Sequence, residues 1–104
     1  MGFDIQKVAK EMLSAAEGEF RDEWPKVKKA MAQVLADEQA ALEKIAQAYI
    51  SGAINEEEFR DQLESERDAF AAGEAMVKVC SKVTIQKAVN AALQALMEAA
   101  KAAV

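Results

Sequence analysis

The sequence contains no histidine, one cysteine and one proline among its 104 residues, and only 6% of it is aromatic. Without histidine there are no Glu-x-x-His pairs of the kind that di-iron bundles use, and no zinc sites built on cysteine and histidine. Ser–His and Cys–His nucleophile pairs are excluded as well. The chain also has neither a Walker loop nor a glycine-rich dinucleotide fingerprint. We therefore expect a protein that is not an enzyme and that carries no cofactor.

The single cysteine, Cys80, has no partner for an intrachain disulfide and is interpreted as a small buried residue in a reducing compartment. The residues from Met1 to Asp4 include an acid and no apolar run, so they do not resemble a signal peptide. No segment is long and apolar enough to span a bilayer. These features predict a cytoplasmic protein without a membrane partner.

The formal net charge is −5, whereas a nucleic-acid-binding protein usually presents a basic surface to phosphates. The one dense basic cluster consists of Lys26, Lys28 and Lys29, and we interpret it as a solvated helix face. The charge balance therefore argues against a nucleic-acid partner.

Apolar residues recur every three or four positions along most of the chain, which is typical of helices with one buried face. The length predicts a single domain, residues 1–104. Helices are expected at about 4–21, 25–51, 55–80 and 84–103. The second and third should form a long antiparallel hairpin, along which the other two pack. We predict an all-α helical bundle, and because so small a core is modest, an oligomeric one.

Several residues mark the expected helix ends. Asp4 is a good N-cap for the first helix. Asp22 would cap the second and place Pro25 in its first turn, where a missing N–H is tolerated. The alternative is one long helix kinked at Pro25. Gly52 is placed to end the second helix, and Asn55 to start the third.

The third helix is expected to continue through Gly73, because its apolar face keeps phase there, with a chain turn as the alternative. The phase fails between Ser81 and Thr84. Either the chain bends there, with one of these two residues as N-cap, or a continuous helix changes partners. We favour the bend. The last helix is apolar over most of its circumference, which predicts more than one neighbour, one of them from a second copy of the chain.

Two glutamates interrupt the apolar stripes of the hairpin. The first stripe comprises Val27, Met31, Val34, Glu38, Ala41, Ile45 and Ala48, and is widened by Leu35, Leu42 and Tyr49. The second comprises Phe59, Leu63, Glu66, Phe70, Gly73, Val77 and Cys80. If the turn centres near Ala53, Glu38 and Glu66 share a level, with Arg67 beside them as a counter-charge. The pair then forms a metal or acid–base site, or a polar layer that fixes register, or the helices rotate and both acids reach water.

Two surfaces are candidates for protein contacts. Four acidic residues form a ridge opposite the apolar face of the third helix, which suits a basic partner: Glu57, Asp61, Glu64 and Asp68. On the last helix, Leu93, Leu96 and Met97 are candidates for contact with a second copy, and a dimer is the favoured assembly.

The turn from Ser51 to Phe59 resembles the exit half of an EF-hand, with Gly52, Ile54 and Glu58 at matching positions. The resemblance covers about nine residues, and the entry half departs from it: Gln47, Tyr49 and Ser51 stand where Asp or Asn is expected. We therefore expect a plain helical turn.

The sequence as a whole favours a small helical protein that works through protein contacts or self-assembly. Bacterial and phage accessory or adaptor proteins often have this build, which is an analogy of form alone. The alternative is a bundle that binds a ligand or divalent metal through Glu38 and Glu66.

Overall fold

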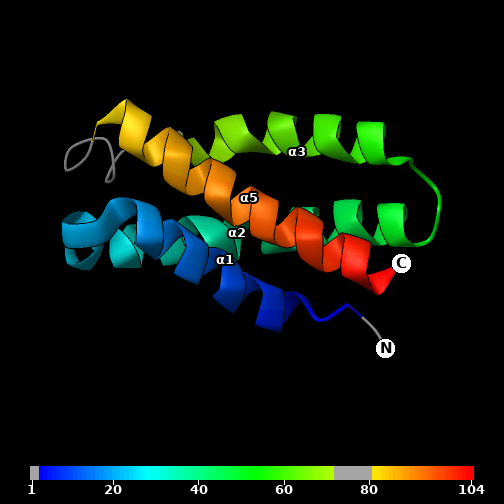
Figure 1. Ribbon diagram of the computed structural model, residues 1–104, viewed down its shortest axis with the longest axis horizontal. Helices are drawn as coiled ribbons and strands as arrows, with labels where there is room; N and C mark the ends of the chain where they lie inside the picture. The colour runs from blue at the N-terminus through cyan, green and yellow to red at the C-terminus, as the bar shows by residue number, and fades with distance from the viewer. Residues whose placement is uncertain (1–2, 72–80) are drawn as a thin grey trace.

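The computed structural model describes the backbone of residues 3–71 and 81–104 and the side chains of residues 3–67 and 81–104. These residues form four α-helices and no strand, as the sequence predicted: α1 (Ile5–Phe20), α2 (Trp24–Ile50), α3 (Glu56–Ala71) and α5 (Lys82–Ala103). Successive helices alternate in direction, and the described ends of the chain lie at the same end of the molecule (Figure 1). The expected extension of the third helix to residue 80, the turn weighed at Gly73 and the burial of Cys80 lie outside the described residues.

The predicted hairpin of α2 and α3 is present, and its connection follows from local chemistry. Gly52 has a φ of +85°, a conformation that suits glycine, directly after the last turn of α2. The N–H of Ala53 donates to the carbonyl of Ala48 at 2.8 Å, and that of Gly52 donates to Tyr49 at 3.1 Å. These are the two hydrogen bonds of a Schellman motif, which ends a helix by reversing the chain.

The start of α3 has the expected capping box. The N–H of Glu58 donates to Oδ1 of Asn55 at 2.8 Å, and the N–H of Asn55 donates to Oε1 of Glu58 at 3.1 Å. The Glu58 carboxylate that resembled an EF-hand ligand is therefore used as a helix cap. The rings of Tyr49 and Phe59 stack across the turn, with centroids 4.6 Å apart, and hold the two helices together at this end.

The junction before α2 is a break and not a kinked continuous helix. A 3₁₀ turn, Arg21–Glu23, separates α1 from α2, and Pro25 lies in the first turn of α2 as predicted. The prediction of Asp22 as N-cap was wrong: Glu23 occupies that position and makes no side-chain capping hydrogen bond. The chain turns at Arg21 instead, where φ is +53°, and the N–H of Trp24 donates to the carbonyl of Arg21.

Both of the other predicted caps are present. Oδ1 of Asp4 accepts a hydrogen bond from the N–H of Gln6 at 3.0 Å, at the start of α1. Ser81 has an extended backbone, and its Oγ accepts from the N–H of Thr84 at 3.2 Å. Because Ser81 caps a new helix, α5 starts here and does not continue an earlier one, as the loss of apolar phase indicated.

The core runs along the centre of the bundle, and α5 is its main contributor. Eight residues of α5 are buried: Ile85, Ala88, Val89, Ala92, Leu93, Leu96, Met97 and Ala100. The most extensive helix pairing is that of α5 with α1, and α5 also packs against α2 and α3. The several neighbours predicted for this helix are thus supplied by the chain itself. The oligomeric state stays a prediction.

Candidate functional site

Glu38 on α2 and Glu66 on α3 lie together, as the register of the hairpin predicted. Both are half-buried. A side-chain hydrogen bond to Glu66 is the largest cause of a raised pKa at Glu38, followed by partial burial and by the negative charges of Glu66 and Asp37. Two carboxyl groups can share a hydrogen bond only when one of them is protonated, which is why the contact with Glu66 raises the pKa of Glu38.

The pair lies at the edge of the core because α2 is rotated relative to its sequence stripe. The core face of α2 consists of Val27, Met31, Leu35, Leu42 and Ala46. Leu35 and Leu42 flank Glu38 along the helix but point inward, while Glu38 is half-buried beside them. The arrangement therefore falls between the polar layer and the solvent-exposed pair that the sequence left open.

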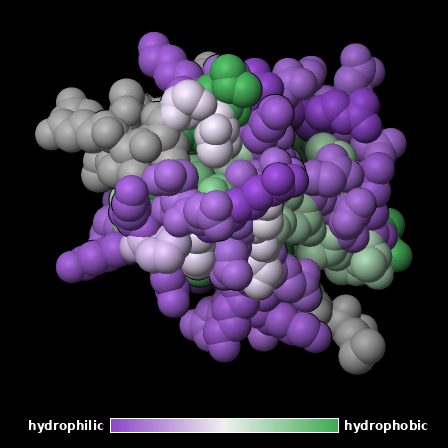
Figure 2. All heavy atoms as spheres, turned by 60° about the vertical axis from the view of Figure 1, so that its left-hand side comes forward, coloured by the Kyte–Doolittle hydropathy of each residue, from purple (hydrophilic) through white to green (hydrophobic). Residues whose placement is uncertain are grey.

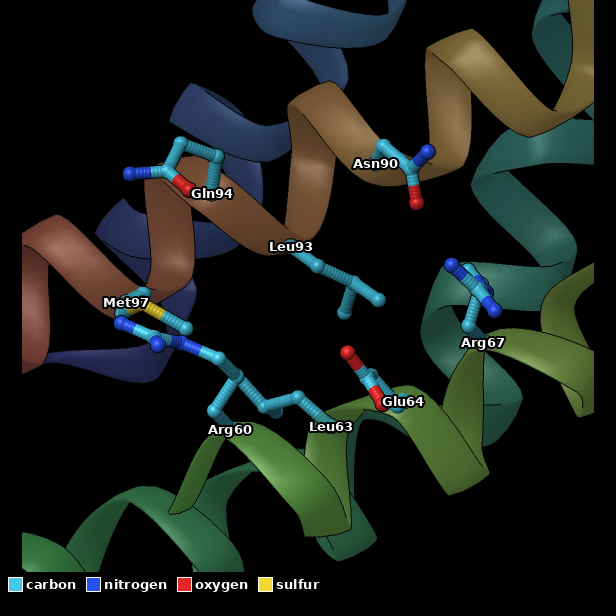
Figure 3. A pocket seen from close by; sticks show the side chains of 8 residues that line it. All are labelled: Arg60, Leu63, Glu64, Arg67, Asn90, Leu93, Gln94 and Met97. Carbon is cyan, nitrogen blue, oxygen red and sulfur yellow. The ribbon is translucent and has the colours of Figure 1, made fainter. Parts of the chain in front are cut away.

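Arg67 was expected to flank the glutamates as a counter-charge, and that expectation was wrong. Its side chain lines a cavity between α3 and α5 (Figure 3). Glu66 and Arg67 are adjacent in sequence, and a helix turns about 100° per residue, so the two side chains leave α3 in different directions. Among the described residues, no cation contributes to the pKa shift of Glu38.

The two carboxylates alone are a sparse donor set for a metal. Within the described residues, no group of three or more acidic, cysteine or histidine side chains is placed to hold an ion. Mg²⁺ is commonly bound through one or two carboxylates with waters completing its coordination shell. The metal chemistry that Glu38 and Glu66 support is thus limited to weak, water-rich coordination of a divalent ion.

Next to this pair, α2 and α3 leave a shallow groove of about 400 Å³, which we call the α2–α3 groove. It is lined by Ala41, Lys44, Ile45, Ala48, Gln62, Ser65 and Glu66. Its floor is made of small or apolar side chains, and its two charged residues have opposite signs. Ala41 and Ala48 were predicted to belong to the buried stripe of α2. The small size of these two side chains is visible in the sequence, and it leaves the surface between α2 and α3 hollow.

The acidic residues predicted to contact a partner are exposed where described, whereas the apolar ones are buried. Glu57, Asp61 and Glu64 are exposed, and the side chain of Asp68 lies outside the described ones. Leu93, Leu96 and Met97 instead lie in the core of this chain, with Leu96 fully buried. On the face shown in Figure 2, hydrophilic side chains predominate, and hydrophobic ones form smaller areas between them.

A second cavity, of about 260 Å³, lies between α3 and α5 (Figure 3). It is lined by Arg60, Leu63, Glu64, Arg67, Asn90, Leu93, Gln94 and Met97. We call it the α3–α5 cavity. Sequence reasoning did not identify it, although both helices contribute residues at i, i+3, i+4 and i+7, the spacing of a single face.

No protein-family model matches this chain, and neither a curated protein nor a solved structure shows significant similarity to it. Among the described residues, none of the helices has the length and apolar character that crossing a membrane requires.

Proposed function

We propose that this chain is a non-catalytic cytoplasmic helical module that works through protein–protein contacts, with a homodimer as the favoured form. The observation that carries the proposal is the α2–α3 groove. Small side chains such as Ala41, Ala48 and Ser65 let the backbone of another helix approach closely, so the groove suits a helical partner. An open apolar floor flanked by charges is also typical of surfaces that bind proteins.

The charges at the groove favour a second copy of the chain. Lys44 projects from α2, and Glu66 from α3. A two-fold axis brings the same patch of both copies together, so residue i of one meets residue j of the other. Lys44 of each copy then faces Glu66 of its partner, and its positive charge compensates the carboxylates, since no described cation contributes to the pKa shift of Glu38.

Replacing Ala41 with arginine tests the groove, because a long side chain there fills the floor. Ala36→Arg is the matched control, since Ala36 lies on the same helix but is exposed. Ala41→Arg should weaken self-association by at least tenfold in sedimentation equilibrium, while Ala36→Arg leaves it unchanged. A parent protein that sediments as an 11.3 kDa monomer throughout the micromolar range would refute the dimer.

The exposed acidic residues of α3 provide the second part of this proposal, a contact with a basic protein partner. Glu57 and Asp61 stand on the outer surface, where charges steer association. A partner captured from the native host through this ridge should be lost with Glu57→Gln/Asp61→Asn and at raised salt. Capture that is insensitive to both would place the contact elsewhere.

A second candidate function, binding of a divalent metal, is favoured by one observation: Glu66 lies near enough to Glu38 to raise its pKa. Mn²⁺ should then raise the Tm of the parent but not of Glu38→Gln/Glu66→Gln. If Mn²⁺ leaves the Tm of the parent unchanged, this function is excluded.

A further inference from the structure

The α3–α5 cavity concentrates arginine. The chain has three arginines, and two of them, Arg60 and Arg67, line this one cavity. Neither makes an ion pair with any residue whose side chain the structure describes. Guanidinium groups present a planar fork of donors that matches a carboxylate, which makes arginine the usual residue where carboxylates are recognised.

The two arginines stand apart along α3. Arg67 lies seven positions after Arg60, which corresponds to about 10 Å along a helix axis. In Figure 3, Arg60 extends toward Met97, and Arg67 stands across from Asn90. Arg67 is half-buried, whereas Arg60 is exposed. The cavity thus has a cationic group near each end and not one cationic centre.

Between the arginines the cavity has an apolar floor. Leu63, Leu93 and Met97 are 2%, 7% and 8% exposed. In Figure 3, Leu93 points from α5 toward Leu63 and Glu64 on α3. A volume of about 260 Å³ is slightly below the range of about 300–1,000 Å³ usual for drug-sized ligands, which restricts the occupant to a small molecule.

We propose that the α3–α5 cavity binds a short α,ω-dicarboxylate, with one carboxylate on each arginine and the methylene chain over the apolar floor. Asn90 adds an amide that donates to the carboxylate at the Arg67 end. Gln94 contributes less, because its Nε2 donates to Glu98 at 3.4 Å. Glu64 is exposed between the arginines and opposes the ligand, so the site has a net charge of +1.

Adipate is the probe, and binding is followed by chemical-shift changes in the isotope-labelled full-length chain. Hexanoate has the same carbon chain with one carboxylate replaced by a methyl group, and succinate is a shorter diacid. Adipate should bind in the millimolar range and shift signals of Leu63, Leu93 and Met97. Hexanoate and succinate should each bind about tenfold more weakly, because each forms only one arginine contact.

Single substitutions test the two ends. Arg60→Gln and Arg67→Gln should each weaken adipate binding by about tenfold. Each variant should then bind adipate and hexanoate with nearly equal affinity. The control Lys28→Gln/Lys29→Gln removes two exposed cations on α2 and should bind adipate like the parent. Glu64→Gln should bind it more tightly by a few fold, because a repulsive charge is removed.

Three results would overturn the dicarboxylate site. The first is that 20 mM adipate causes no localised chemical-shift changes. The second is that the parent binds adipate and hexanoate equally well. The third is that the arginine variants bind adipate as tightly as the lysine control does. Arg60→Gln/Arg67→Gln should still self-associate like the parent, since neither arginine lines the α2–α3 groove. Failure of the dicarboxylate site is therefore distinguishable from failure of the proposed dimer.

Discussion

Replacing Glu38 with glutamine should stabilise the fold at neutral pH. The folded state raises the pKa of Glu38 above its ordinary value of 4.5, mainly through the hydrogen bond with Glu66. Between the ordinary and the raised pKa, the folded chain binds more protons than the unfolded chain, so stability falls as pH rises. Above the raised pKa, this contribution to the stability of the folded state is lost completely. The amide carries no charge and can still donate to Glu66, which removes the penalty.

The magnitude follows from the position of the pair. Both side chains are half-buried at the edge of the core, where water screens their repulsion. Exposed charge pairs are worth about 0.2–1 kcal/mol, and we expect about 0.5 kcal/mol for Glu38→Gln at pH 7. In a domain of this size, that corresponds to a rise in Tm of about 2–4 °C. The gain should shrink in 1 M salt, where the Debye length is about 3 Å.

Thermal unfolding followed by circular dichroism between pH 3.5 and 8 measures this effect. Glu11→Gln is the control, because it removes an exposed carboxylate from the middle of α1. Glu66→Gln should stabilise to a similar extent, and the double variant should gain less than the sum, since either change relieves the same repulsion. A destabilising Glu38→Gln at pH 7, or a gain equal to that of Glu11→Gln, would refute the coupling.

Three further predictions concern the helix ends. Gly52→Ala should cost about 1 kcal/mol in denaturant unfolding, purely from the positive φ, since an added Cβ meets no atom within 4 Å; a neutral substitution would contradict the Schellman geometry. Asn55→Ala should cost about 1 kcal/mol by the same measurement, because it removes the side-chain half of the capping box; Asn55→Ser should retain most of that stability. Lys101 is hydrogen-bonded to Glu56 and lowers its pKa, so Lys101→Gln should raise the pKa of Glu56 in a carboxyl-carbon NMR titration; an unchanged titration would exclude the contact in solution.

The features that the sequence predicted well are those set by neighbouring residues. The capping residues Asp4, Asn55 and Ser81 and the glycine at position 52 act within four residues of themselves, so their chemistry is visible in the chain. The level of Glu38 and Glu66 was also predictable, because a short turn fixes the register of two helices.

The features that the sequence did not predict depend on how each helix rotates about its own axis. The stripe containing Glu38 and the face containing Leu35 and Leu42 differ by a small rotation, and only packing against α1 and α5 decides between them. The rotation of α3 is likewise not visible in the sequence. Arg67 was therefore predicted beside the glutamates, whereas its side chain lines the α3–α5 cavity. The cavity itself arises between two helices distant in sequence, so no local pattern reveals it.

The rotation that places Glu38 at the edge of the core also connects the carboxyl pair with the proposed dimer. Glu66 belongs both to the pair and to the α2–α3 groove. If Lys44 of a second copy approaches Glu66, its positive charge favours the ionised pair and lowers the pKa of Glu38 toward its ordinary value. By linkage, self-association should then strengthen as pH rises through the raised pKa of Glu38. Glu38→Gln should flatten this pH dependence, while a dimer formed through another surface would show the same pH dependence with and without Glu38.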